Sequence, residues 1–277
     1  MKNACIYFFS FLCISCFSEK SGTKKLKTSR VEVEIPEFQL IIDAAQVSGS
    51  ILIYDLQKNR YYSNNFEWIE NAYLPASTFK IPNSIIALET GVVKNDSSVF
   101  KWNGEKRNMK IWEQDLIFKD AFQFSCVPCY QEIARAIGAV KMNLYLDSLN
   151  YGEMEVTETN IDLFWLEGSS KITQLQQIDF LKRLYLSQLP ISERTEMIIK
   201  RMLLIEKKES YSLSGKTGWS IRNGNNNGWF VGFIESNEQV FFFATNIVPE
   251  KQFNMTMFPK IRKEITQKAF QHLGVIK

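Results

Sequence analysis

Histidine is almost absent from this 277-residue chain, since His272 near the C-terminus is the only one. A Ser-His-Asp triad needs a histidine beside its nucleophile, and zinc hydrolases usually bind their metal through several histidines. One histidine in the closing segment fits neither arrangement. If the chain is a hydrolase, a different side chain must act as its general base, and we expect no metal site.

The chain also lacks an apolar run long enough to cross a bilayer as a stable helix. Its N-terminal run, residues 6–17, follows Lys2 and precedes polar residues, which is typical of a secretory signal. We therefore expect residues 1–17 to be a signal peptide, residues 18–30 a polar tether and residues 31–277 the functional domain, exported to the periplasm.

The N-terminal segment leaves a lipid anchor open. Cys16 stands where a lipoprotein signal places its acylated cysteine, and the small Ser15 precedes it. Cys13, however, stands where such signals prefer an aliphatic residue. The only membrane attachment that the sequence suggests is therefore a lipid at Cys16, and both forms of the protein stay open.

Positive charge is missing from the expected domain. The net charge of the whole chain is +3, but the first thirty residues alone carry +5, so the residues from Val31 onward carry −2. A nucleic-acid-binding protein concentrates basic side chains on its folded domain. We expect no nucleic-acid partner.

Only two cysteines, Cys126 and Cys129, belong to the expected domain. Their C-x-x-C spacing would suggest thioredoxin-like chemistry in a cytosolic protein beside a βαβ pattern. The surroundings here are helical, and the chain carries an export signal. We interpret the pair as cysteines at the start of a helix, either packed together or joined by a disulfide.

Strand-forming sequence gathers at the two ends of the expected domain, and helical sequence lies between them. The runs are separated by turns rich in Asn and Gly, which favours antiparallel pairing. This pattern predicts an α+β fold: an antiparallel sheet built from both chain ends and flanked by helices, with an inserted helical subdomain and the site between the two. The expected strands are Ser50–Leu56, Arg60–Ser63, Tyr211–Ile221, Gly228–Ser236 and Gln239–Val248, so the sheet spans about 48–63 and 211–248, the helical subdomain about 95–205 and the closing helix 259–273.

Ser77 and Lys80 form the first chemical candidate, an S-x-x-K motif at the start of an apolar helix. Three residues apart, they share one face of a helical turn. Pro82 has no N–H for the carbonyl of Thr78, so we expect a tight or 3₁₀-like turn there, with regular helix continuing to Glu89. Burial would lower the pKa of Lys80 and let it act as a base.

Two further motifs are weak alone and specific together. Ser125-Cys126-Val127 precedes a predicted helix, and Lys216-Thr217-Gly218 lies in a predicted strand, where a cation, a hydroxyl and a glycine can hold a substrate carboxylate. Two other S-x-x-K matches, Ser21–Lys24 and Ser98–Lys101, lie in polar segments and are interpreted as chance. The ordered set S-x-x-K, S-x-V and K-T-G is typical of serine enzymes that react with β-lactams.

With these motifs, the chain resembles the class D β-lactamases over nearly everything after residue 30. The resemblance implies the fold shared by serine β-lactamases and penicillin-binding transpeptidases. Val127 favours class D, because the corresponding triplet of the related families typically ends in Asn. The matching segments are Pro75–Asn83, Trp112–Asp115, Ser125–Pro128, Phe164–Gly168, Gly215–Ser220 and Gly228–Gly232.

The resemblance implies a role for each matching residue. Ser77 would be the nucleophile, and Lys80 would be the base after carbon dioxide converts it to N6-carboxylysine. Trp165 would hold that carbamate through its indole N–H, while Val127 and Leu166 keep the pocket dry. No other cofactor is implied.

The remaining implied roles concern the substrate. Ser125 would relay a proton to the leaving nitrogen, and the backbone N–H groups of Ser77 and Trp219 would form an oxyanion hole. Trp112 would edge the cleft. The carboxylate of the β-lactam would be bound by Lys216, Thr217, Gly218 and Arg262.

One departure from the family pattern and two rival functions stay open. The family's Tyr-Gly-Asn is Tyr151-Gly152-Glu153 here, so the loop may be anchored differently, because a carboxylate cannot donate as an amide does. The alternatives to hydrolysis are a β-lactam sensor that remains acylated and a penicillin-binding transpeptidase. The preferred β-lactams, carbapenems included, and the oligomeric state are not predicted.

Overall fold

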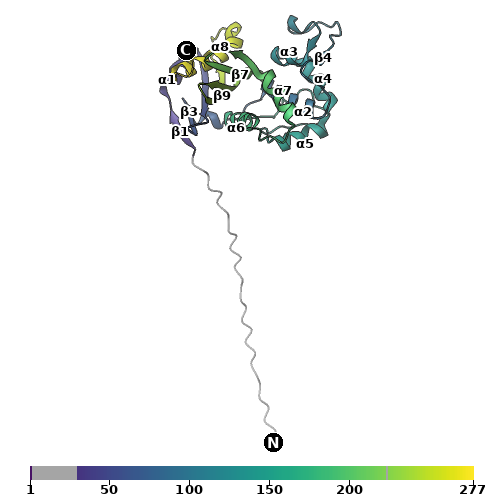
Figure 1. Ribbon diagram of the computed structural model, residues 1–277, viewed down its shortest axis with the longest axis horizontal. Helices are drawn as coiled ribbons and strands as arrows, with labels where there is room; N and C mark the ends of the chain where they lie inside the picture. Colours follow the sequence, from purple (N-terminus) through teal and green to yellow (C-terminus); the bar gives the residue numbers. More distant parts are fainter. Residues whose placement is uncertain (2–29, 223) are drawn as a thin grey trace. The chain divides into compact units, whose positions relative to one another are not determined.

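A seven-stranded sheet organises residues 31–277 (Figure 1). The computed structural model describes residues 1, 30–222 and 224–277, so nearly all of the expected signal peptide and tether, Cys16 included, lies outside the described residues. The strand order is β1-β3-β2-β9-β8-β7-β6. The strands are β1 (Val31–Glu34), β2 (Val47–Asp55), β3 (Arg60–Ser63), β6 (Leu204–Lys207), β7 (Tyr211–Arg222), β8 (Asn225–Ser236) and β9 (Gln239–Pro249).

The pairing of these strands is antiparallel with one exception. β1 pairs in parallel with β3, placing Val33 opposite Tyr62, so the sheet is mixed rather than wholly antiparallel. The sequence analysis predicted neither β1 nor β6. Both are four-residue edge strands without a fully buried residue, and they therefore lack the apolar pattern that reveals a strand.

Apolar layers cover both faces of the sheet. Neighbouring residues of a strand point to opposite faces. Phe243 of β9 packs with apolar residues of α1 (Pro36–Ala44) and α8 (Phe258–His272), whereas Phe242 packs with those of α6 (Gln174–Tyr185). Because both faces are buried, β9 is a nearly continuous apolar run instead of an alternating one.

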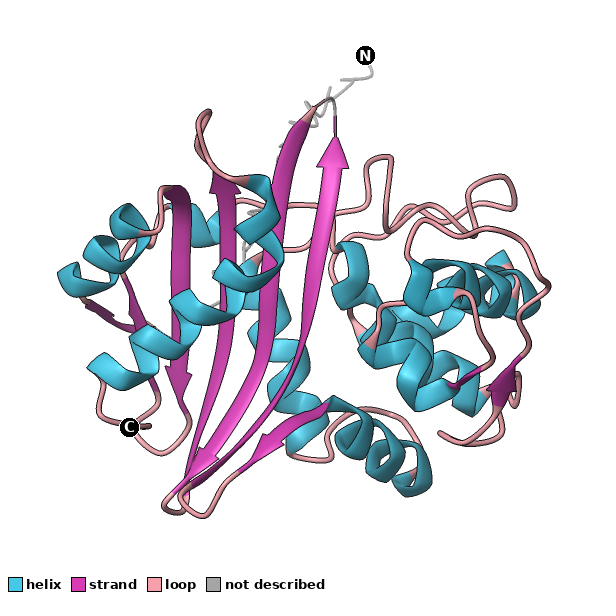
Figure 2. Cartoon of the chain, turned by 90° about the horizontal axis from the view of Figure 1, so that it is seen from above, coloured by secondary structure: helices cyan, strands magenta, loops and turns pink. Residues whose placement is uncertain are grey.

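A group of helices beside the sheet surrounds α2 (Lys80–Glu89) (Figures 1 and 2). α2 packs against α4 (Val127–Ile137), α5 (Ala139–Leu149) and α7 (Glu193–Leu203), and its residues 80–88 are all buried. No helix in the described ranges is long and apolar enough to cross a membrane. The remaining elements are α3 (Phe118–Gln123), the paired strands β4 (Val99–Phe100) and β5 (Leu116–Ile117), and the 3₁₀ helices η1 (Trp68–Glu70), η2 (Ala76–Phe79), η3 (Lys110–Trp112) and η4 (Met255–Met257).

The helices that carry clear start signals are present where the sequence predicts them. Thr173 accepts the N–H of Gln176 at 3.1 Å, and the Gln176 side chain accepts the N–H of Thr173 at 2.9 Å, which completes the expected capping box. The helix α6 that begins there packs on β8 and β9, so this part of the expected helical subdomain covers the sheet. The sequence analysis did not predict α1 or α5.

Candidate active site

The nucleophile candidate Ser77 lies on η2, a single 3₁₀ turn that leads directly into α2. The predicted 3₁₀ turn is therefore confirmed. Ala76, just before it, has a φ of 48°, in the left-handed region that a residue with a side chain rarely adopts. Its N–H donates to the carbonyl of Trp165 at 2.9 Å, and the N–H of Thr78 donates to the carbonyl of Pro75 at 3.1 Å. These bonds hold the turn that presents Ser77.

Lys80 is fully buried one turn away, and its Nζ lies 3.2 Å from the Oγ of Ser77. Burial lowers the pKa of Lys80 from 10.5 to about 7. The amine also lies 4.9 Å from the centre of the Tyr130 ring, whose hydroxyl is 2.7 Å from that of Ser84. A large part of the Lys80 population is therefore neutral near pH 7 and able to accept a proton from Ser77.

Trp165 is the second buried polar group of this region. Its ring stacks on Phe79 with centroids 5.5 Å apart, and its indole Nε1 has no hydrogen-bond partner among the described residues. Buried donors almost always have partners. A neutral buried amine at Lys80 and an unpaired buried donor at Trp165 fit a small carboxylate-like group attached to the amine.

The sequence analysis missed Asn83, which is fully buried three residues after Lys80 on α2. Neither polar atom of its amide has a partner among the described residues. An Asn within the apolar run from Ile81 to Leu88 was the available signal, because polar side chains rarely occupy such positions unpaired.

Ser125 and Lys216 meet although 91 residues separate them in the chain. The Nζ of Lys216 donates to the Oγ of Ser125 and, at 3.3 Å, to the carbonyl of Thr217. The pKa of Lys216 is lowered well below its ordinary value, first by burial and then by the positive charges of Lys80 and Arg262. The three sequence motifs thus form one electrostatically connected group.

The K-T-G motif lies on an edge of β7 that β6 leaves uncovered. β6 pairs only with residues 212–214, and η2 packs beside the following part of β7. A Cβ on Gly218 would lie 2.9 Å from the carbonyl oxygen of Pro75. The close approach that this glycine allows is therefore to the turn that carries Ser77.

Arg262 of α8 provides a buried cation next to this edge. Its guanidinium donates to the carbonyls of Gly218, Phe258 and Pro259. It forms no ion pair with an acidic side chain in the described part of the chain, and burial lowers its pKa to about 10, so it remains charged at neutral pH. Together with Lys216 it makes this corner suitable for an anion.

The other expected site residues surround this group. Val127 and Leu166 are half-buried and pack against the core cluster that contains Trp165. The indole of Trp219 donates to the side chain of Asn226 at 2.8 Å. Trp112 is buried, and its indole donates to the carbonyl of Phe124 at 3.0 Å, next to Ser125.

The loop at Glu153, where the chain departs from the family pattern, is anchored by backbone and charge. Glu153 and Lys171 exchange two backbone hydrogen bonds of 2.9 and 2.8 Å. Their side chains form an exposed ion pair at 3.1 Å. The loop therefore does not depend on an amide donor at this position.

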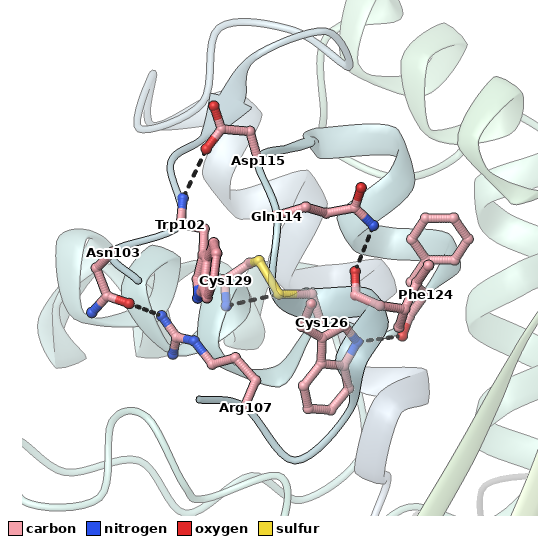
Figure 3. Close-up of a disulfide and its surroundings, with 10 residues drawn as sticks. Trp102, Asn103, Arg107, Gln114, Asp115, Phe124, Cys126 and Cys129 are labelled. Carbon is pink, nitrogen blue, oxygen red and sulfur yellow. Dashed lines mark hydrogen bonds between the residues drawn. A yellow bond between two sulfur atoms is a disulfide. The ribbon is translucent and has the colours of Figure 1, made fainter. Parts of the chain in front are cut away.

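Cys126 and Cys129 form a disulfide at the start of α4, so the bonded alternative of the sequence analysis is confirmed (Figure 3). Each thiol is used in the bridge, which agrees with the structural interpretation of the pair.

Comparison with known proteins agrees with this geometry. Residues 43–271 match the penicillin binding protein transpeptidase domain. Beta-lactamase OXA-10 of Pseudomonas aeruginosa is 36% identical over 272 residues, covering 97% of this chain and 98% of that protein. Beta-lactamase OXA-48 of Klebsiella pneumoniae is 40% identical over 217 residues, covering 78% and 82%.

Solved structures lead to the same group. The crystal structure of the class D beta-lactamase from Sebaldella termitidis superimposes with a TM-score of 0.84 at 37% identity, covering 90% of this chain and all of that one. The serine and lysine pair, the S-x-V turn and the K-T-G edge are thus found in a chain whose relatives share one activity. The chain belongs to the class D β-lactamases, serine hydrolases that act on the β-lactam amide.

Proposed function

We propose that this chain hydrolyses penicillins and related antibiotics through an acyl-enzyme on Ser77. The observation that carries the proposal is the pairing of a half-buried serine hydroxyl with the fully buried amine of Lys80 at 3.2 Å. An amine whose pKa is about 7 is poised for proton transfer at physiological pH.

In acylation, the Oγ of Ser77 attacks the lactam carbonyl carbon while its proton moves toward Lys80. The carbon–nitrogen bond of the ring then breaks, and the leaving nitrogen takes a proton from Ser125, which Lys216 can resupply through its hydrogen bond. The backbone N–H groups of Ser77 and Trp219 would stabilise the charge that develops on the carbonyl oxygen. Water then hydrolyses the ester to free Ser77.

The same residues fit carbon dioxide bound to Lys80. The neutral amine is the form that reacts with carbon dioxide, and the unpaired N–H of Trp165 would donate to the added group. Val127 and Leu166 would exclude water from it. When bound, the group supplies carboxylate oxygens, which are suited to accepting a proton.

The cationic corner formed by Lys216, Thr217, Gly218 and Arg262 would bind the carboxylate of the substrate. The hydroxyl of Thr217 provides a neutral donor between the two cations. Arg262 contributes a planar group that can bind a carboxylate through two hydrogen bonds. Trp112 would lie at the border of this site.

A chromogenic cephalosporin separates this proposal from its rivals. A hydrolase releases product steadily, a sensor releases one equivalent in a burst, and a transpeptidase turns over very slowly. We expect steady release that is lost in Ser77→Ala without loss of folding. A single burst from the wild-type protein, or unchanged turnover in Ser77→Ala, would contradict the proposal.

We also propose that the protein is exported and that residues 1–17 are its signal. The mass of the mature protein, isolated from cells, tests both this cleavage and lipidation at Cys16. A mature chain that retains residues 1–17 would contradict the signal, and a mass increase lost in Cys16→Ser would identify the lipid anchor.

A further inference from the structure

The disulfide between Cys126 and Cys129 is built into the S-x-V motif itself (Figure 3). Cys126 stands between Ser125 and Val127 and is 1% exposed. Its Sγ also accepts the backbone N–H of Cys129 at 3.3 Å, so the bridge and the cap of α4 use the same atom. Any change in the bridge therefore acts first on the turn that carries Ser125.

This bridge is poorly placed to stabilise the whole fold. A disulfide stabilises largely through the loop that it closes, and longer loops gain more. Cys126 and Cys129 are only three residues apart, and their Cα atoms are separated by 5.4 Å within one helical turn. The bridge instead fixes local geometry.

Ser125 needs such fixing. Its φ is 54°, in the left-handed region that a residue with a side chain adopts only where its surroundings enforce it. On the preceding side, the indole of Trp112 donates to the carbonyl of Phe124 at 3.0 Å. On the following side, the N–H of Cys126 donates to the carbonyl of Ala121 at 2.9 Å, and the disulfide restrains the same residue.

We propose that the Cys126–Cys129 disulfide is a positioning element that holds the hydroxyl of Ser125 against the amine of Lys216. The proposal rests on the proposed role of Ser125 as proton donor to the leaving nitrogen. Opening the bridge frees the first turn of α4, so the bond between Ser125 and Lys216 is held in fewer molecules. Acylation then slows, because proton transfer depends steeply on the position of the donor.

A thiol can reach the bridge. Both cysteines line a cavity of about 300 Å³, together with Trp102, Arg107 and Glu132. A dithiol would attack one sulfur to form a mixed disulfide and release the other cysteine as a thiol. Its second thiol then closes a cyclic disulfide and frees the first cysteine, so two electrons and two protons pass from the reductant to the protein.

The test compares acylation of the full-length enzyme, oxidised or reduced with dithiothreitol, by stopped-flow mixing with a chromogenic cephalosporin. We expect the acylation rate to fall about tenfold or more on reduction, since small displacements of reacting groups are costly. Reoxidation should restore the rate. Cys129→Ala, which removes the bridge but keeps the Cys126 side chain, should show the same loss without a reductant.

Ser125→Ala provides the control that a purely structural role would not pass. If the bridge acts through Ser125, reduction should change the remaining rate of this variant by less than about twofold, because the two changes are not additive. Equal acylation rates for oxidised and reduced wild-type enzyme, with reduction verified by mass, would overturn the proposal. An equal loss on reduction in Ser125→Ala would also overturn it. An oxidised wild-type enzyme without turnover would instead overturn the proposed function.

Discussion

Two buried lysines give the site its chemistry at the scale of single residues. Lys80 and Lys216 are at most 4% exposed, and the positive charge of Lys80 is one cause of the lowered pKa of Lys216. Protonation of either amine therefore disfavours protonation of the other. This mutual effect favours a neutral Lys80 beside Ser77 at the pH where Lys216 holds its proton.

Replacing Lys80 with Met should abolish turnover and raise stability. Because the pKa falls from 10.5 in the unfolded chain to about 7 when folded, the unfolded state binds the proton more tightly between these values. The penalty is therefore full below pH 7 and disappears as the pH approaches 10.5, with an upper limit of about 5 kcal/mol. Thermal denaturation in buffer depleted of carbon dioxide should show a higher Tm for Lys80→Met at pH 6 and a smaller difference at pH 9.

The exposed Lys106 provides the matched control, since Lys106→Met should leave the Tm nearly unchanged. Equal Tm values for Lys80→Met and the wild-type protein at pH 6 would show that the buried amine carries no such penalty.

Trp165→Phe tests the unpaired indole. Phe retains much of the stacking on Phe79 and removes the N–H, so we expect kcat to fall about tenfold or more, with partial recovery in excess bicarbonate. Trp68→Phe loses an indole hydrogen bond to Asn246 outside the site and should keep its activity. Wild-type kinetics in Trp165→Phe would remove Trp165 from the mechanism.

Arg262→Lys tests the carboxylate corner. The substitution keeps a positive charge but loses the planar group, so KM for a penicillin should rise about tenfold, more than kcat changes. An analogue whose carboxylate is esterified should not distinguish the variant from the wild type. Equal KM values for the free carboxylate would place substrate binding elsewhere.

At the scale of elements, the contact between β7 and η2 aligns the oxyanion donors with the nucleophile. Gly218→Ala would place a Cβ 2.9 Å from the carbonyl oxygen of Pro75 and force the two elements apart. We expect kcat/KM to fall by about 100-fold, the loss typical of a displacement near 1 Å. Steady-state kinetics check this, and retained activity would show that the contact is not needed.

Gly104→Ala is the control for backbone strain. Gly104 also has a positive φ, 84°, but nothing lies within 4 Å of its added Cβ. Its substitution should lower stability slightly and leave kcat/KM unchanged.

Elements with strong local signals could be predicted from sequence. The central strands, the 3₁₀ turn imposed by Pro82 and the capping box at Thr173 were all evident. β1 and β6 were not, because an exposed four-residue edge strand has no buried face to produce a pattern. The parallel pairing of β1 depends on the course of the chain between β1 and β3, which no local signal encodes.

Across the whole molecule, the site is assembled from η2, α2, β7, α8 and the turn before α4. Motif chemistry predicted the membership of Ser77, Lys80, Ser125 and Lys216, and their mutual contacts required the structure. The neighbour of Gly218 and the buried amide of Asn83 could not be predicted, since both depend on segments that approach only in the folded chain.

Turnover at mildly acidic pH, with and without bicarbonate at constant ionic strength, tests most directly the claim that the buried amine of Lys80 is the reactive base. As the pH falls through about 7, the amine is protonated and activity should decline. Added ¹³C-bicarbonate should restore much of the rate by mass action and produce a carbamate signal that is absent in Lys80→Met. Equal rates with and without bicarbonate, and no ¹³C signal at Lys80, would contradict the account.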